Sequence, residues 1–188
     1  ALKKRSLQIA AKSTFQRNTM AVKAGLAAML EAKPDAVVMV GPYAPLAAFI
    51  KEARAAGLKS QLATVSFVGT DNLVAEVGKD GDGVVISQVV PFPDDNDLPI
   101  QRECREALQA NGGERLGFVN FEGCITAKVM VAALERAGKD PERATLVSSL
   151  QGMSGVDLGG MKLSFGENNH QALSDVFLTQ IRDGKITK

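Results

Sequence analysis

The sequence predicts an α/β fold built around a mainly parallel sheet. Short apolar runs alternate with amphipathic helical segments through the first half of the chain. Residues 36–40 are apolar at every position, as in parallel strands that are covered on both faces. The chain also opens inside such an alternation, and a βα unit needs neighbouring strands to bury its apolar run. We therefore expect these residues to be the C-terminal part of a longer protein.

The first half alternates predicted strands with predicted helices. Strands are expected at residues 7–11, 36–40, 62–67 and 84–90, and helices at residues 21–31, 45–56 and 71–77. Asn18 or Thr19 is the expected cap of the first helix, and Asp71 that of the third. Pro34 and Gly57 mark where the first two helices end.

The second half begins with residues 91–97, which are rich in proline and acid and predict a crossing linker. Helices are expected at residues 99–110, 121–137 and 141–150, the first of them exposed. Strands are expected at residues 161–165 and 176–181, with Asp183 and Gly184 as a hairpin turn. The helix at residues 121–137 is too broadly apolar for a free surface. We expect it to pack on a sheet that this chain does not supply.

Bulk composition restricts the function classes. The net charge is +1 and charged residues make up 23% of the chain, so nucleic acid is not an expected partner. No apolar stretch approaches the roughly 20 residues that span a bilayer. The composition is that of an ordinary globular domain.

Two cysteines, Cys104 and Cys124, are too few for a four-ligand zinc site. Three interpretations stay open. They are half-buried thiols on neighbouring helices, a disulfide formed in an oxidising compartment, or a pair that includes a nucleophile.

Signs of catalysis are missing from the sequence. His170 is the only histidine, and it lies in a polar turn without a neighbouring nucleophile. No phosphate loop or dinucleotide fingerprint occurs, and no cluster has metal-ligand spacing. The sequence therefore predicts a binding protein without catalytic residues, metal or cofactor.

Several motifs, in order, resemble one family over nearly the whole chain. They are PDAVVMVGPY at 34–43, FIKEARAAGLK at 49–59, GVVISQVVP at 83–91, FEGCITAKV at 121–129, and the late FG and NHQ turns at 165–166 and 169–171. In this order they resemble the C-terminal half of the solute-binding proteins of branched-chain amino acid ABC transporters. These are type I periplasmic binding proteins, in which two Rossmann-like lobes are joined by three crossings.

The resemblance implies a division of the chain. Residues 1–90 would form the second, C-terminal lobe, and residues 91–98 a hinge crossing. Residues 99–160 would be helices that pack on the first lobe, whose strands precede this chain. Residues 161–188 would be the return crossing and terminal strands. The lobes are accordingly incomplete in this chain.

The resemblance also places a ligand in the cleft between the lobes, where the parallel strands end. The expected ligand-binding residues are Gly41, Tyr43, Thr64, Ser66, Phe67, Leu116 and Phe121. Tyr43 matches a position whose aromatic ring covers the ligand. Core packing is an alternative role for Phe67, Leu116 and Phe121, and a structural hydroxyl bond is the alternative for Tyr43.

Ser66 departs from the family pattern. Several amino acid binders carry at this position a glutamate that neutralises the ligand's ammonium group. A buried ammonium without a carboxylate is costly. The departure favours a carboxylate or neutral solute over an α-amino acid.

The resemblance implies an extracytoplasmic protein that delivers a small amino acid, amide or organic acid to an ABC permease. Its location would be the periplasm or the outside of a membrane, with a lipid anchor as one means of tethering. A ligand-sensing receptor or regulatory domain of the same fold is the alternative. A small flavodoxin-like enzyme is a third, disfavoured by the missing phosphate loop and acid–base pair.

Overall fold

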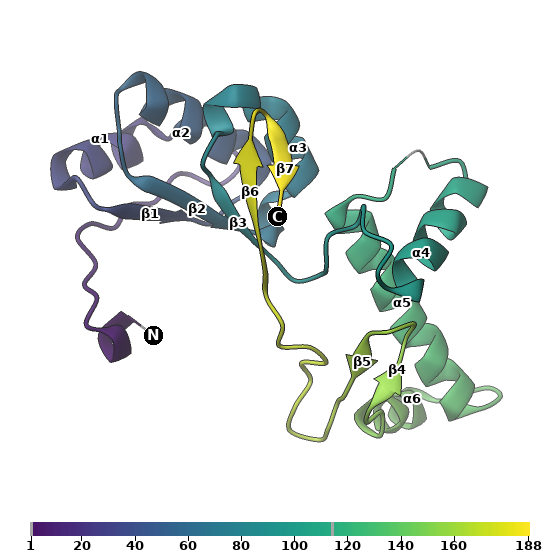
Figure 1. The fold of residues 1–188 in the computed structure, drawn as a ribbon. Helices are drawn as coiled ribbons and strands as arrows, with labels where there is room; N and C mark the ends of the chain where they lie inside the picture. Colours follow the sequence, from purple (N-terminus) through teal and green to yellow (C-terminus); the bar gives the residue numbers. More distant parts are fainter. Residues whose placement is uncertain (1, 114) are drawn as a thin grey trace. The chain divides into compact units, whose positions relative to one another are not determined.

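The computed structural model describes residues 2–113 and 115–188, which form two compact units (Figure 1). The first unit runs to Gln88 and also includes Leu178–Lys188. The second unit is Val89–Phe177. The chain therefore leaves the first unit after one strand and returns to it in another.

The first unit is an α/β layer with a five-stranded sheet in the order β1-β2-β3-β6-β7. The strands are β1 (Ala36–Met39), β2 (Gln61–Val65), β3 (Val85–Gln88), β6 (Phe177–Arg182) and β7 (Lys185–Thr187). The first three are parallel, with Val37 opposite Leu62 and Thr64 opposite Ile86. The mainly parallel α/β sheet predicted from the sequence is confirmed.

Three helices cover one face of this sheet (Figure 1). They are α1 (Lys23–Ala32), α2 (Tyr43–Ala55) and α3 (Thr70–Val77). Met39 from β1 and Ile86 from β3 belong to one buried cluster with Leu26, Ile50 and Leu73 from the helices. Burial of such aliphatic side chains contributes about 1.5–3 kcal/mol each, so this cluster is the main source of stability of the unit.

The opposite face of β1 is uncovered, contrary to the sequence prediction. Val37 and Met39 are buried, whereas Val38 is 72% exposed and Val40 is 64% exposed. Alternate residues of a strand point to opposite faces, so the helices bury one set and leave the other in solvent. The apolar run therefore has one face in the core of this unit and one face exposed.

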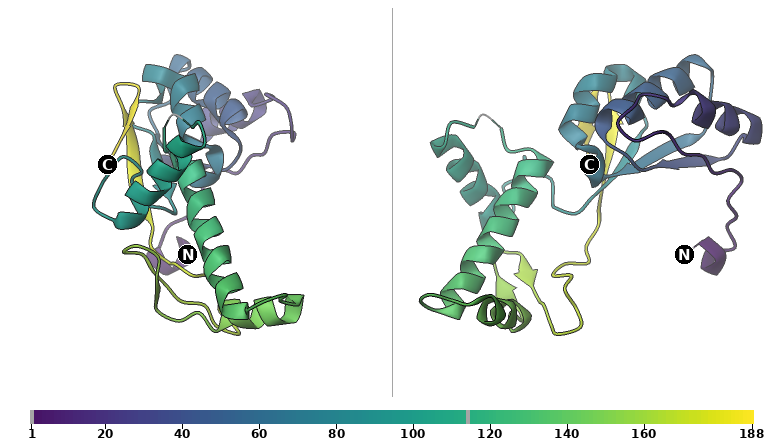
Figure 2. Two further views of the ribbon diagram at one scale, coloured as in Figure 1. Left: turned by 90° about the vertical axis from the view of Figure 1, so that its right-hand side faces the viewer. Right: turned by 180° about the vertical axis from the view of Figure 1, so that it is seen from behind.

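The predicted strand at residues 7–11 does not form. After the short 3₁₀ helix Leu2–Arg5, the chain runs without regular structure to the start of α1 (Figures 1 and 2). A strand exists only through hydrogen bonds to a neighbour, and this segment belongs to no ladder of the described residues. The apolar pattern alone could not show that.

Two predicted helix caps are also wrong. The N-cap of α3 is Gly69, with φ of +77°, and Asp71 lies inside the first turn. The N-cap of α1 is Val22, and Thr19 lies in the preceding turn, where its hydroxyl donates to the Gln16 carbonyl at 2.7 Å. Thr19 is used by the turn before α1, and α3 begins earlier than predicted, at the left-handed Gly69, so that neither polar residue is the cap.

The second unit contains α4 (Pro99–Ala110), α5 (Phe118–Ala137), α6 (Arg143–Gln151) and a small hairpin of β4 (Val156–Asp157) and β5 (Lys162–Leu163). The helix α4 matches its prediction in extent. It is not simply exposed, however, because Ile100, Gln101 and Cys104 are buried. These side chains fix one face of α4 in the interior.

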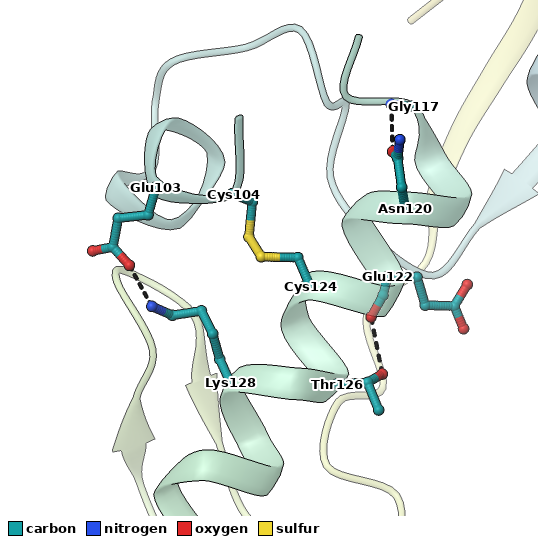
Figure 3. Close-up of a disulfide and its surroundings, with 8 residues drawn as sticks. All are labelled: Glu103, Cys104, Gly117, Asn120, Glu122, Cys124, Thr126 and Lys128. Atoms are coloured by element: carbon teal, nitrogen blue, oxygen red, sulfur yellow. Dashed lines mark hydrogen bonds and ion pairs between the residues drawn. A yellow bond between two sulfur atoms is a disulfide. The ribbon is translucent and has the colours of Figure 1, made fainter. Parts of the chain in front are cut away.

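A disulfide joins Cys104 in α4 to Cys124 in α5 (Figure 3). An ion pair links the same two helices, between Glu103, next to Cys104, and Lys128, one turn after Cys124. The disulfide is the second of the three interpretations that the sequence left open. It closes a loop with a sequence separation of 20 residues.

The segment at residues 91–97 is held by α4. Gln101 donates from its side-chain amide to the Phe92 carbonyl at 2.8 Å. Arg105 donates from Nη2 to the carbonyls of Pro93 and Asp95, at 2.7 and 3.1 Å. A proline-rich segment without its own secondary structure thereby gains a fixed path.

The chain ends in the predicted hairpin. β6 and β7 pair antiparallel, with Arg182 opposite Lys185. The two turn residues, Asp183 and Gly184, have φ of +50° and +67°, as a tight two-residue turn of this kind requires. This prediction is confirmed.

Candidate functional site

The carboxyl ends of β1, β2 and β3 lie at one edge of the first unit's sheet, because the three strands are parallel. Ligands of open α/β sheets bind in the crevice outside these ends. Five predicted ligand-binding residues come from this edge. They are Gly41, Tyr43, Thr64, Ser66 and Phe67.

Gly41 is buried two residues after the end of β1, where the Phe15 ring packs against it. A Cβ atom at this position would lie 2.9 Å from Cζ of the Phe15 ring. Any larger residue would displace that ring. Gly41 therefore leaves room for the Phe15 ring and shapes the edge, and it offers no functional group.

Tyr43 is the first residue of α2, so its backbone position is set by the helix start after Pro42. Its side chain is 40% exposed. The aromatic ring and hydroxyl are thus available at the strand edge. A tyrosine offers a flat apolar face and one hydrogen-bonding group, which suits contact with a small organic ligand.

Thr64 is buried, and its hydroxyl donates to the Met39 carbonyl at 2.9 Å. This bond ties the end of β2 to the end of β1. Since the donor is already used, Thr64 serves here to hold the two strand ends together. A ligand role for its hydroxyl stays a prediction.

Ser66 and Phe67 lie in the 3₁₀ turn Ser66–Val68, which connects β2 to α3. The Ser66 carbonyl accepts a bond from the Gly69 amide at 3.1 Å. Phe67 is 73% exposed. An aromatic ring in solvent at a strand end is more consistent with a contact surface than with the core role left open from the sequence.

Leu116 and Phe121 belong to the second unit and are buried there, at 2% and 0% exposure. Burial to this degree favours the packing role for both. Their contribution to a ligand site stays a prediction.

A buried polar network that the sequence analysis missed lies beneath this edge. Gln88, at the end of β3, donates to the hydroxyls of Thr70 and Thr179 at 3.0 and 3.1 Å. Thr179 in turn donates to the Ile86 carbonyl at 3.1 Å. The network joins β3, β6 and the start of α3, where the chain enters and leaves the unit. The sequence signal that could have revealed this network is Gln88, a glutamine inside the apolar run at residues 84–90.

The described residues hold no group of three or more His, Cys, Asp or Glu side chains that could bind a metal ion. His170, the histidine considered as a catalytic residue and disfavoured, is exposed beside the bridge between Gly166 and Asn169. Across the same residues, no helix is both long and apolar enough to cross a membrane.

Comparisons with known proteins agree with this geometry. A sequence model of the family described as periplasmic binding protein matches residues 1–185. A solved structure from Rhodopirellula baltica SH 1, a "possible leucine/isoleucine/valine-binding protein", is 36% identical over 92% of this chain and 48% of its own, with a TM-score of 0.86. A comparison with curated proteins found no match.

Two further solved structures share the fold. A substrate-binding periplasmic protein from Ralstonia solanacearum is 26% identical over 95% of this chain and 52% of its own, with a TM-score of 0.80. A branched-chain amino acid ABC transporter protein from Thermus thermophilus, solved with bound valine, is 20% identical over 98% of this chain and 52% of its own, with a TM-score of 0.83. The chain thus spans about half the length of these proteins.

The parallel sheet with helices on one face defines an α/β lobe. The family match and the similarity to the R. baltica protein then fix the assignment. This chain belongs to the periplasmic binding protein family.

Proposed function

We propose that the protein is an extracytoplasmic solute-binding protein that delivers a small ligand to an ABC importer. The observation that carries the proposal is the exposure of Tyr43 and Phe67 just after the carboxyl ends of β1 and β2, in a chain of this family. Similar solved proteins are described as leucine-binding or branched-chain amino acid transport proteins. The proposed role is binding, without catalysis.

The lobes are assigned as follows in this proposal. The first unit is the C-terminal lobe, and residues 91–98 are a hinge crossing. The helices of residues 99–160 pack on the other lobe, and residues 161–188 return to the C-terminal lobe. The exposed apolar side chains of α5, such as Val119, Met130 and Val131, support this assignment because they need a partner surface.

The proposed ligand is a small carboxylate or neutral amide. Ser66 occupies the position where an ammonium group would need a carboxylate partner, and the five crevice residues named above include none. An unpaired buried ammonium is costly, so this lobe disfavours an α-amino acid.

The disulfide supports an extracytoplasmic location. Disulfides persist in oxidising compartments such as the periplasm and are rare in the cytosol. Cys104 is 1% exposed, so the bond is protected within the second unit. A permease in the membrane is the proposed partner, and a lipid anchor is one proposed means of tethering.

A matched ligand series tests the proposal on the complete protein. Leucine, 4-methylpentanoate and 4-methylpentanamide share one aliphatic chain and differ in their polar groups. We expect the carboxylate or the amide to raise the melting temperature more than leucine does. A ligand at 100 times its Kd adds about 2.7 kcal/mol of stability, so the difference between the ligands is measurable. A larger effect of leucine contradicts the ligand class. No binding of any amino acid, amide or organic acid, by calorimetry, contradicts the function.

A further inference from the structure

Three buried polar side chains meet inside the first unit, at the carboxyl end of β3. Thr70 and Gln88 are fully buried, and Thr179 is 3% exposed. They come from three separate elements, which are the start of α3, the end of β3 and the interior of β6. Polar groups among aliphatic side chains are costly unless they are hydrogen-bonded, so the bonds between these three decide whether they can be buried.

The Gln88 amide lies at the centre of this network. Its Nε2 donates to the hydroxyls of Thr70 at 3.0 Å and Thr179 at 3.1 Å, and its Oε1 accepts from the Thr70 hydroxyl at 3.4 Å. The Thr179 hydroxyl donates onward to the Ile86 carbonyl at 3.1 Å. An amide nitrogen has two protons, and both are used here, so the side chain cannot rotate without losing a hydrogen bond. One side chain therefore connects three elements in a fixed arrangement.

Two members of the network lie where the chain leaves and re-enters the unit (Figure 1). Gln88 is the last residue of the unit before residues 89–177, and Thr179 is the second residue after the return. The strands that carry them, β3 and β6, are neighbours in the sheet. The Ile181 amide donates to the Val84 carbonyl at 3.0 Å, which joins the other ends of these strands. The network thus ties β3 to β6 at the end where both continue into the second unit.

The third member of the network fixes the turn that carries two predicted ligand-binding residues. Thr70 begins α3 shortly after the 3₁₀ turn Ser66–Val68, in which Phe67 is exposed. Between the turn and the helix, the Gly69 amide donates to the first carbonyl of the turn at 3.1 Å. The bond from Gln88 to Thr70 therefore holds the end of the turn in place.

We propose that Gln88 is a positioning residue for ligand binding, which holds the turn Ser66–Val68 and the paired ends of β3 and β6 as one rigid group. The proposal rests on the function proposed above. Gln88 and Thr179 are buried, so they act through the turn and not by contact with a ligand. A turn that is fixed before binding loses less conformational freedom on binding, which raises affinity. A change at Thr179, in β6, should therefore alter the turn.

Amide hydrogen exchange of the ligand-free complete protein, read by NMR at single residues, tests this coupling. Thr179→Val removes an acceptor of the Gln88 amide and leaves the sequence of the turn unchanged. We expect the Gly69 amide to exchange about fivefold faster or more, because loss of buried hydrogen bonds favours local opening. Thr179→Ser keeps the hydroxyl and should exchange like the wild type. Exchange of Gly69 at the wild-type rate in Thr179→Val overturns the proposal.

Ser60→Ala is the matched control, which separates this coupling from a general loss of stability. Ser60 is buried, and its hydroxyl donates to the Pro34 carbonyl next to the amino end of β2, at the opposite end of the strand from the turn. The variant loses a buried hydrogen bond outside the network, so the Gly69 amide should exchange as in the wild type. Equal acceleration of Gly69 exchange in Ser60→Ala and Thr179→Val overturns the proposal.

Ligand affinity gives a second reading. Among leucine, 4-methylpentanoate and 4-methylpentanamide, the compound that binds the wild type best should bind Thr179→Val about fivefold more weakly by calorimetry, while Ser60→Ala retains the affinity. Equal affinity of the wild type and Thr179→Val overturns the positioning role. If no amino acid, amide or organic acid binds the wild type, the proposed function is wrong, and the exchange of Gly69 still decides whether the turn and the strands are coupled.

Discussion

At the scale of single residues, accessibility separates the crevice side chains. Tyr43 and Phe67 are exposed, whereas Thr64 is buried with its hydroxyl donated to Met39. Gly41 is needed because Phe15 packs on it. The sequence predicted Gly41, Tyr43, Thr64 and Phe67 as ligand-binding residues. It could not distinguish side chains that are free to contact a ligand from those that hold the edge together.

The first prediction concerns Tyr43. In the complete protein, Tyr43→Ala should weaken ligand binding about tenfold or more, because the contact between its ring and the bound ligand is lost. Tyr43→Phe is the matched control and should retain most of the affinity, since the ring remains. Isothermal titration calorimetry measures both. Equal affinity of the wild type and the alanine variant removes Tyr43 from the site.

The second prediction concerns the buried network. Thr179→Val keeps the side-chain shape but removes an acceptor of Gln88 and the bond to the Ile86 carbonyl. We expect the free energy of unfolding to fall by about 1–3 kcal/mol. Thr187→Val removes one bond, to the Gln180 carbonyl, at a partly buried site and is the control. Urea denaturation measures the free energy of unfolding of both variants. Equal losses in the two would show that the network contributes no more than a single hydrogen bond.

At the scale of elements, the sequence predicted α4, β1 and the terminal hairpin well because their signals are local. A proline start, an apolar run and an Asp-Gly turn act within a few residues. The prediction of a strand at residues 7–11 was wrong because a strand forms only when it pairs with a neighbouring strand. The caps of α1 and α3 failed because the preceding turns decide which residue begins the helix.

The disulfide yields a prediction about α4 and α5. Replacing both Cys104 and Cys124 by alanine should lower the free energy of unfolding by about 3 kcal/mol, as for other loops of about this length. The same loss should follow when the wild type is unfolded in a reductant, while the double variant should not respond to reductant. A wild type whose unfolding is unchanged by reductant contradicts a structural role for the bond.

Arg105 yields a second prediction at this scale. Its guanidinium holds Pro93, Asp95 and Asn96 at once, and its Nη1 lies 2.6 Å from Asn96 Oδ1. Arg105→Lys keeps the charge but loses the planar fork, so amides of residues 92–97 should exchange faster. Arg102→Lys, which replaces a single bond to the Asn96 carbonyl, is the control. Equal exchange in both variants contradicts the holding role.

At the scale of the whole molecule, the incompleteness of the chain was the strongest inference from sequence. It rested in part on the broadly apolar helix predicted at residues 121–137. The structure shows apolar side chains of that helix exposed, at Met130 and Val131. The ligand could not be predicted to the same depth, because a site between two lobes depends on residues that lie outside this sequence.

Native mass spectrometry of the protein purified from its source, repeated after denaturation, tests the central claim most directly. We predict a polypeptide heavier than 19.8 kDa that loses a small organic molecule when it is denatured. The lost mass identifies the ligand. A polypeptide of only 19.8 kDa, with nothing bound, contradicts the claim that these residues are part of a two-lobed solute-binding protein.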